Sequence, residues 1–242
     1  MKEKKNRLNW YYYLPEDGPQ DRQICQYMQL DYLIQMLETH KYHVSRRRVF
    51  DDANESYENA KLAFPIAPAK DNGLPKQELV ERTIPYFDII HCPTSCWTKN
   101  TEEQYFMWKM YATEIGVCVK STVHNLIASL NLNLDKDGEN RVICGSMNYK
   151  EKIIPSTNER SQLFDKDKAY ANEDEFRFYF HLSDDTNKKT TNHILIPIDT
   201  KTLMDEIILS PFICKEAADK LARMIICSYG INVVKQSKIN IK

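Results

Sequence analysis

The stretch KAYANEDEFRFYF, residues 168–180, decides the fold because charged residues and phenylalanines alternate along its second half. In a β-strand successive side chains point to opposite faces, so Glu173, Glu175 and Arg177 are expected on one face. The other face carries the three phenylalanines Phe176, Phe178 and Phe180. Phenylalanines along one side of a strand require a hydrophobic core, which indicates a sheet with at least one covered face.

The charged face of this strand is a candidate catalytic site. Two carboxylates about 7 Å apart, with a guanidinium one step further on, place acid and base groups against a polar substrate. Glu175 lies between Glu173 and Arg177, so it is the candidate for a buried catalytic carboxylate, whereas Glu173 is expected to be more exposed. A half-buried antiparallel strand with a solvated outer face explains the same spacing. The spacing therefore locates a site without naming its reaction.

Length and charge limit the class of protein. The chain has 242 residues, of which 42% are hydrophobic and 11% aromatic, enough for a substantial core. Its 33 Lys and Arg nearly balance its 34 Asp and Glu, so general binding to nucleic acid or to an acidic membrane is not indicated. No run reaches the roughly 18 apolar residues that a membrane span requires. We therefore expect no membrane partner.

The seven cysteines are scattered among apolar neighbours, as buried free thiols are in a reducing cytosol. The cluster from His91 to Cys96 lacks a second ligand pair at zinc-site spacing, so no metal site is predicted. The basic N-terminus is not followed by an apolar segment of the kind that secretory signals contain. These features together predict a cytoplasmic protein.

The order of strand-like and helix-like segments predicts one α+β domain over residues 1–242. Its central sheet is expected to be mixed, largely antiparallel and flanked by helices. Residues 194–242 form either part of this domain or a C-terminal subdomain packed against it. Residues 51–80 are rich in proline, asparagine and charge, and we expect an irregular insertion or loop there.

Three helices have recognisable limits. The apolar spacing over residues 24–39 predicts an amphipathic helix. A capping box with Thr101 as N-cap and Gln104 reaching back predicts the start of a second helix. A third helix is expected over residues 215–229 and is ended by Gly230.

Three polar and aromatic segments, far apart in the sequence, are expected to converge on one substrate site. They are residues 11–13, residues 95–98 and residues 173–177. Two further aromatic residues, at positions 108 and 111, fall on one stripe of a predicted helix, where such a pair lines either a pocket or the core. The candidate substrate-binding residues are Tyr11, Tyr13, Ser45, Ser95, Trp97, Thr98, Trp108, Tyr111 and Tyr170.

Several segments, taken in order, resemble a bacterial and phage family designated domain of unknown function 2971. The resemblance spans nearly the whole chain and rests on Ser45, Gly116, Tyr170 and residues 10–13, 50–55, 95–98, 107–112, 173–177 and 208–212. One departure is Asp52-Ala53, where the family shows a proline, so this loop is expected to be shaped differently. The resemblance implies a shared fold and a setting of phage conflict or defence, but no particular reaction.

A looser similarity runs to ADP-ribosyltransferases, which carry an arginine or aromatic residue early, a serine-rich strand in the middle and a glutamate pair late. The same order here is Arg7 or residues 11–13, then residues 95–98, then Glu173 and Glu175. The similarity implies NAD as cofactor. It also implies that Glu175 stabilises the cationic ribose, that Glu173 orients the acceptor and that an aromatic ring stacks on nicotinamide.

Two other classes of function remain open. In a non-enzymatic binding or interaction module, with a small molecule, a nucleotide or a protein as partner, Glu173, Glu175 and Arg177 form a structural ion network. In a metal-dependent nuclease, the same glutamates act with the carboxylates of residues 51–55. Geometry separates a site from a scaffold, because a site requires these charges at the base of an open pocket with aromatic walls.

Overall fold

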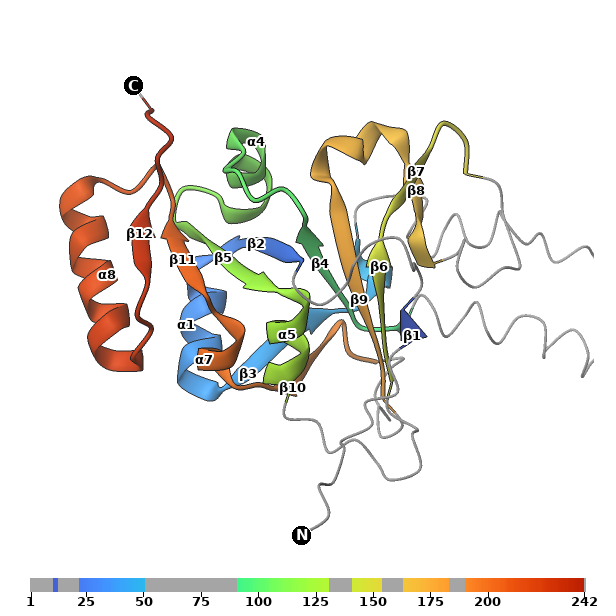
Figure 1. Cartoon of the computed structure of the whole chain (residues 1–242), viewed down its shortest axis with the longest axis horizontal. Helices are drawn as coiled ribbons and strands as arrows, with labels where there is room; N and C mark the ends of the chain where they lie inside the picture. Colours follow the sequence, from blue (N-terminus) through green and yellow to red (C-terminus); the bar gives the residue numbers. More distant parts are fainter. Residues whose placement is uncertain are drawn as a thin grey trace, which may run out of the picture.

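The central sheet is mixed and largely antiparallel in the computed structural model (Figure 1), which describes residues 11–12, 22–50, 91–130, 141–153, 163–182 and 190–241. Among these residues, eight strands pair in the order β1-β6-β9-β4-β2-β5-β11-β12. Their bounds are β1 (Tyr11–Tyr12), β2 (Gln23–Gln29), β4 (Thr94–Thr98), β5 (Gly116–Thr122), β6 (Arg141–Ser146), β9 (Glu175–His181), β11 (Glu206–Leu209) and β12 (Val234–Gln236). The pairs β1–β6 and β11–β12 are parallel and the other five are antiparallel, which confirms the predicted α+β class.

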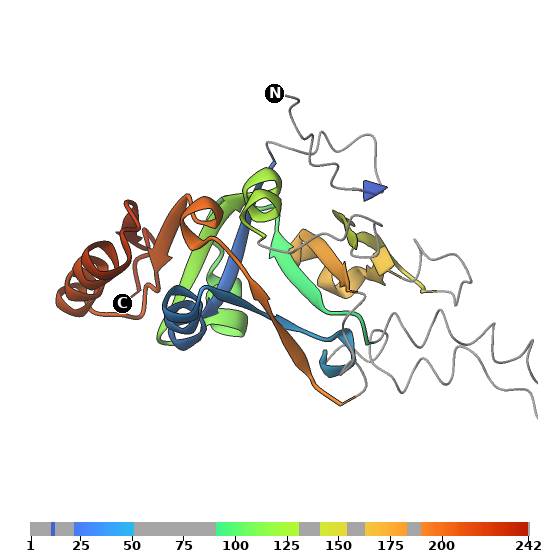
Figure 2. The same ribbon diagram turned by 90° about the horizontal axis from the view of Figure 1, so that it is seen from below.

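Two short ribbons and a set of helices flank the sheet. β3 (Lys41–Ser45) pairs antiparallel with β10 (His193–Pro197), and β7 (Asn148–Lys150) pairs parallel with β8 (Asp165–Asp167). The helices are α1 (Leu30–Thr39), η2 (Arg47–Val49), α4 (Tyr105–Met107), η3 (Trp108–Ala112), α5 (Val123–Ser129), η4 (Lys168–Glu173), α7 (Thr200–Leu203) and α8 (Lys215–Tyr229). Helix α8 lies beside β12 at one end of the sheet and the β7–β8 ribbon lies at the other (Figure 1). Seen from below, β3 and β10 run side by side away from α1 (Figure 2).

The main hydrophobic core covers one face of the sheet. Side chains of α1, α5, α7, α8 and the β3–β10 ribbon pack there against the inward face of the strands. Phe176, Phe178 and Phe180 of β9 are buried in this core, as their alternation predicts. Burying each such ring stabilises the fold by about 1.5–3 kcal/mol relative to leaving it in water. The apolar half of the alternation thus fixes which way β9 faces.

The opposite face carries two smaller apolar clusters. One lies under α4 and η3 and consists of Cys25, Tyr27, Met107, Trp108, Ala112, Cys118 and Ile208. The other lies beside β6 and β9 and consists of Met147, Leu163, Phe164 and Tyr179. Glu175 and Arg177 share the face of β9 on which Tyr179 lies, as the period of two predicts. This face is covered as well, so the solvated outer face is not what forms.

The predicted helix over residues 24–39 is wrong in its first half. β2 occupies residues 23–29, and α1 begins only at Leu30. Ile24 points into the main core, whereas Cys25 and Tyr27 belong to the cluster on the opposite face. Apolar residues of β2 belong to clusters on both faces of the sheet, so they do not alternate strictly with polar ones, and their spacing does not separate the strand from a helix.

The predicted capping box at Thr101 does not form. Helix α4 begins at Tyr105 with Gln104 as its N-cap, and the chain then continues as the π-helix η3. This helix ends at Thr113, whose φ of 55° lies in the left-handed region. Gly116 begins β5, where an added Cβ would lie 2.1 Å from the carbonyl oxygen of Ala112. Glycine is required at position 116 by close packing.

The C-terminal third follows its sequence signals closely. Helix α8 spans Lys215–Tyr229, and Gly230 ends it in the left-handed region, with its N–H donated to the Ile226 carbonyl at 3.0 Å. β11 pairs with both β5 and β12, so residues after 205 extend the sheet built by earlier strands. No helix in the described parts of the chain combines the length and the apolarity of a membrane span.

Candidate functional site

A pocket of about 460 Å³ opens on the second face of the sheet, where β2 and β4 meet. The two strands pair in register at Cys25 and Thr98, and the side chain of Gln26 donates to the Cys96 carbonyl at 3.1 Å. The pocket is lined by Cys25, Tyr27, Val49, Phe50, Cys96, Trp97, Thr98, Met107, Met110, Tyr111, Lys166, Tyr170, Glu173, Glu175 and Arg177. Strands, a π-helix and the 3₁₀-helices η2 and η4 therefore contribute side chains to one cavity.

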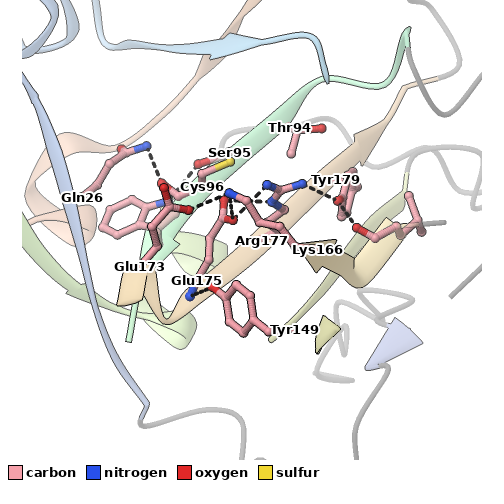
Figure 3. Close-up of polar contacts among 12 residues, drawn as sticks. Gln26, Thr94, Ser95, Cys96, Tyr149, Lys166, Glu173, Glu175, Arg177 and Tyr179 are labelled. Atoms are coloured by element: carbon pink, nitrogen blue, oxygen red, sulfur yellow. Dashed lines mark hydrogen bonds and ion pairs between the residues drawn. The ribbon is translucent and has the colours of Figure 1, made fainter. Parts of the chain in front are cut away.

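Four buried charges form a continuous network along one wall of the pocket (Figure 3). The Arg177 guanidinium donates from Nε to Glu175 Oε1 at 2.8 Å and from Nη2 to Glu175 Oε2 at 2.9 Å. The Lys166 ammonium donates to Glu173 Oε2 at 2.6 Å and to Glu175 Oε2 at 3.0 Å. Among the described residues, two carboxylates and two cations thus pair with one another in the pocket wall.

Glu173 reaches the network by a different route from the one predicted. It is the last residue of η4, and Asp174 then turns the chain with a φ of 43° before β9 begins at Glu175. The two glutamates therefore do not share one strand. Both are 5% exposed, so the expectation that Glu173 is the more exposed of the two is wrong. The Tyr111 hydroxyl, which donates to Glu173 Oε1 at 2.5 Å, and the Lys166 ammonium both cover it.

The protonation states follow from these contacts. Burial by itself raises the pKa of Glu175, but the charges of Arg177 and Lys166 outweigh it and lower the pKa to about 2. Glu175 is therefore a permanent anion near neutral pH and a poor proton acceptor. Burial, together with the hydrogen bond to Glu173, raises the pKa of Tyr111, so its hydroxyl stays a neutral donor.

The surroundings of the network hold its side chains in place. The backbone N–H of Glu175 donates to the Tyr149 hydroxyl at 2.8 Å, and the Arg177 guanidinium lies 5.5 Å from the centre of the Phe50 ring. Gly145 lies opposite Arg177 in the β6–β9 register, and an added Cβ there would lie 3.1 Å from a Phe164 ring carbon. The position tolerates little more than hydrogen because the aromatic ring occupies this space.

Several predicted site residues come together in the pocket. Thr98 lies opposite Glu175 in the β4–β9 register, so the middle and late segments meet. Tyr111 and Tyr170 line the pocket, and Trp97 reaches it from β4 although its indole packs into the main core.

Other predicted site residues lie elsewhere. Ser95 faces the main core, where it contacts the Tyr42 hydroxyl and accepts from the Trp97 indole N–H at 2.8 Å. Trp108, the first residue of η3, is fully buried in the apolar cluster under that helix. Of the two alternatives for the aromatic stripe, this residue therefore belongs to the core and not to the pocket lining. Ser45 pairs with His193 in the β3–β10 ribbon, away from the pocket lining.

The early aromatic segment does not contribute a described pocket residue. Tyr11 lies in β1, which pairs with β6 at the edge of the sheet, and β6 separates it from β9. Tyr13 and Arg7 lie outside the described residues, as does the segment 51–80. Among the described residues, Tyr27 of β2 is the aromatic residue from an early strand that lines the pocket, in place of the predicted Tyr11 and Tyr13.

Lys166 is the main site residue that the sequence did not indicate, and Cys96 lies within the predicted segment 95–98 but was not among the individual candidates. Lys166 stands in the polar run from Asp165 to Lys168, which has the composition of a turn. It reaches the glutamates because β8 pairs with β7 and η4 then folds back toward β9. Only the period of β4 held a usable signal, since it places Cys96 on the same face as Thr98.

The described residues can also be compared with the requirements of a metal ion and of a cofactor. No group of three or more His, Cys, Asp and Glu side chains that could hold a metal ion occurs in the parts of the chain that the structure describes. Asp51, Asp52 and Glu55, the further carboxylates of the nuclease hypothesis, lie outside them. A flat ring such as nicotinamide suits the aromatic walls of the pocket, which Tyr27 and Tyr170 help to form.

Comparisons of the chain with family models, with curated proteins and with solved structures gave no match in any of the three. The two family resemblances therefore stay predictions. The chemistry of the pocket itself carries the functional proposal.

Proposed function

We propose that the pocket binds NAD and cleaves its nicotinamide–ribose bond, in the manner of ADP-ribosyltransferases. The observation that supports this proposal best is Glu175, a buried carboxylate whose pKa is about 2, at the wall of an aromatic pocket. The pocket volume of about 460 Å³ falls within the range of about 300–1,000 Å³ usual for small-molecule sites.

The proposed reaction needs a fixed anion more than a base. As the glycosidic bond breaks, its electron pair leaves with nicotinamide, and positive charge develops on the ribose C1′ until an acceptor or water attacks. A permanently ionised Glu175 stabilises this charge without having to reorganise. The bidentate pair with Arg177 holds the carboxylate in one orientation, and no proton has to move to or from Glu175 before the bond breaks.

A non-enzymatic binding module is the second candidate function. The specific observation in its favour is the ion pairing within the described residues, where Lys166 contacts both glutamates and Arg177 pairs with Glu175. In this case the pocket binds a small molecule or nucleotide without turning it over, and the network fixes the sheet.

Release of nicotinamide from NAD tests the proposal, with transfer of label from NAD to protein or nucleic acid measured beside it. Glu175→Gln keeps the shape and removes the charge, so turnover is expected to fall by about 10²–10³-fold. Glu206→Gln is the matched control, because Glu206 also pairs with two cations, Lys235 at 2.6 Å and Lys120 at 3.8 Å, but lies outside the pocket lining.

The outcomes separate the two candidates. Turnover by wild type and Glu206→Gln but not by Glu175→Gln supports the transferase. Binding of NAD by calorimetry without release of nicotinamide supports the binding module. Folded wild type that neither binds nor cleaves NAD overturns the proposal.

A further inference from the structure

We infer that Glu173, Glu175 and Tyr170 form a binding site for an organic cation, which in this structure holds the Lys166 ammonium. The ligand is then a flat ring that carries a positive charge, such as an N-alkylated pyridinium. The inference builds on the proposed function, because it concerns the same pocket and names the feature of the substrate that the pocket recognises.

The surroundings of the Lys166 ammonium are those of a cation site. Its Nζ lies 2.6 Å from Glu173 Oε2, 3.0 Å from Glu175 Oε2 and 4.6 Å from the centre of the Tyr170 ring. Carboxylates joined to an aromatic face are the groups that bind organic ammonium and pyridinium ligands. Tyr111 donates to the remaining oxygen of Glu173 and so keeps that carboxylate oriented.

Arg177 and Lys166 hold the carboxylates in different ways. Arg177 projects from the central strand β9, is 1% exposed and engages both oxygens of Glu175. Lys166 projects from the three-residue strand β8 and holds a single oxygen of each glutamate. The lysine has a flexible four-carbon stem, whereas the arginine forms a rigid bidentate pair. Lys166 is therefore the cation that a ligand can replace.

Charge decides which ligand can replace it. With Lys166 displaced, Glu175 stays paired with Arg177, and the described residues supply no other cation to the buried carboxylate of Glu173. Leaving a buried charge unpaired is costly, so a neutral ring does not compensate for the lost ammonium, whereas a cationic ring does. Phe50 and Met110, on the pocket lining, supply apolar surface for the rest of such a ring. The pocket is therefore expected to select an oxidised, cationic nicotinamide ring over a neutral one.

The test compares 1-methylnicotinamide, a cation, with nicotinamide, its neutral relative, by calorimetry and thermal shift. In wild type the cation is expected to bind at least about five-fold more tightly than the neutral ring. In Lys166→Met the affinity for the cation rises about ten-fold further, and the affinity for nicotinamide changes less than two-fold. Lys150→Met is the matched control, since Lys150 pairs with Asp165 at 2.5 Å on the neighbouring ribbon and lies outside the pocket lining.

Equal binding of the two compounds by wild type, or a Lys166→Met variant that gains no affinity for the cation, overturns the inference. If Lys166→Met does not fold, Tyr170→Leu decides, because losing the ring face is expected to weaken cation binding about five-fold and to leave nicotinamide unaffected. An unchanged ratio in that variant also overturns the inference. Selective cation binding without NAD cleavage keeps the inference and overturns the transferase, and cleavage without selectivity does the reverse.

Discussion

Strand β9 buries both of its faces, but apolar packing fills one and ion pairs fill the other. Phe178 on the first face is fully buried, and Arg177 on the second is 1% exposed. The phenylalanine face requires only apolar side chains that fill the space against it, and side chains of the neighbouring helices do so. The charged face needs partners of opposite sign at defined distances, and these come from Lys166 and Arg177. The alternation of side chains along β9 therefore shows which face each side chain points to. Whether that face is buried depends on the side chains that pack against it from elsewhere in the chain.

The largest expected effect comes from breaking the charged face at its most buried member. Arg177→Met leaves Glu175 without its bidentate partner, and removal of one member of a buried pair costs about 3–5 kcal/mol. Chemical denaturation measures this loss in the free energy of unfolding. Lys235→Met is the control, because its side chain is 61% exposed and its pair with Glu206 is worth at most about 1 kcal/mol. A loss below about 1 kcal/mol in Arg177→Met would contradict the buried network.

Acid is the second way to test the charged face. The pKa of Glu175 is lowered from 4.5 to about 2, so its ionised form stabilises the fold above pH 4.5. That contribution, of the order of 3 kcal/mol, is lost as the pH falls from 4.5 to 2. Denaturation curves over this range are expected to show a shallower loss of stability in Glu175→Gln than in wild type. Parallel curves for the two proteins would show that Glu175 is not responsible.

Replacing the ion pair on the charged face of β9 by apolar residues tests how far the two faces differ in energy. Glu175→Leu combined with Arg177→Met removes both charges of the bidentate pair and leaves Lys166 with Glu173. Replacing a buried pair by apolar residues is often close to neutral, so the double variant is expected to recover about 2 kcal/mol of what Arg177→Met loses. A double-mutant cycle by denaturation measures the coupling. Additive losses would mean that the two side chains act independently.

The smallest effect is expected at the rim of the network. Tyr111→Phe removes the hydroxyl that donates to Glu173, and because the residue is 41% exposed the loss is expected to be about 1 kcal/mol. Thermal or chemical denaturation detects it, with Tyr105→Phe on the same helical segment as control. Binding of 1-methylnicotinamide should weaken in Tyr111→Phe and not in the control, since the orientation of Glu173 changes only in the first.

The sequence carried the local part of the fold well. The phenylalanine face, the Glu175–Arg177 pair and helix α8 all follow from spacing or from end signals within a few residues. The same period of two, applied to β4, would have placed Ser95 and Trp97 on the core side and Thr98 with Cys96 on the site side.

Non-local pairing explains what the sequence could not show. Lys166 joins the network through the β7–β8 ribbon, and Glu173 through the turn between η4 and β9, and neither contact leaves a periodic signal. β2 is covered on both faces by segments distant in sequence, so its pattern resembled a helix. The structure at Lys166, Glu173 and β2 thus depends on contacts with residues distant in the sequence, which local patterns do not reveal.

The junction between β2 and β4 has a mechanical consequence. β2 is in register with β4 at one position, Cys25 opposite Thr98, whereas it is in register with β5 at seven. Fewer ladder bonds cross this line than join β2 to β5, so we expect β2 and β4 to separate more easily than β2 and β5. The pocket takes lining residues from both strands, Tyr27 on one side and Thr98 on the other. A ligand that contacts both β2 and β4 is expected to restrict the motion of one strand against the other, and so to stiffen the sheet between them.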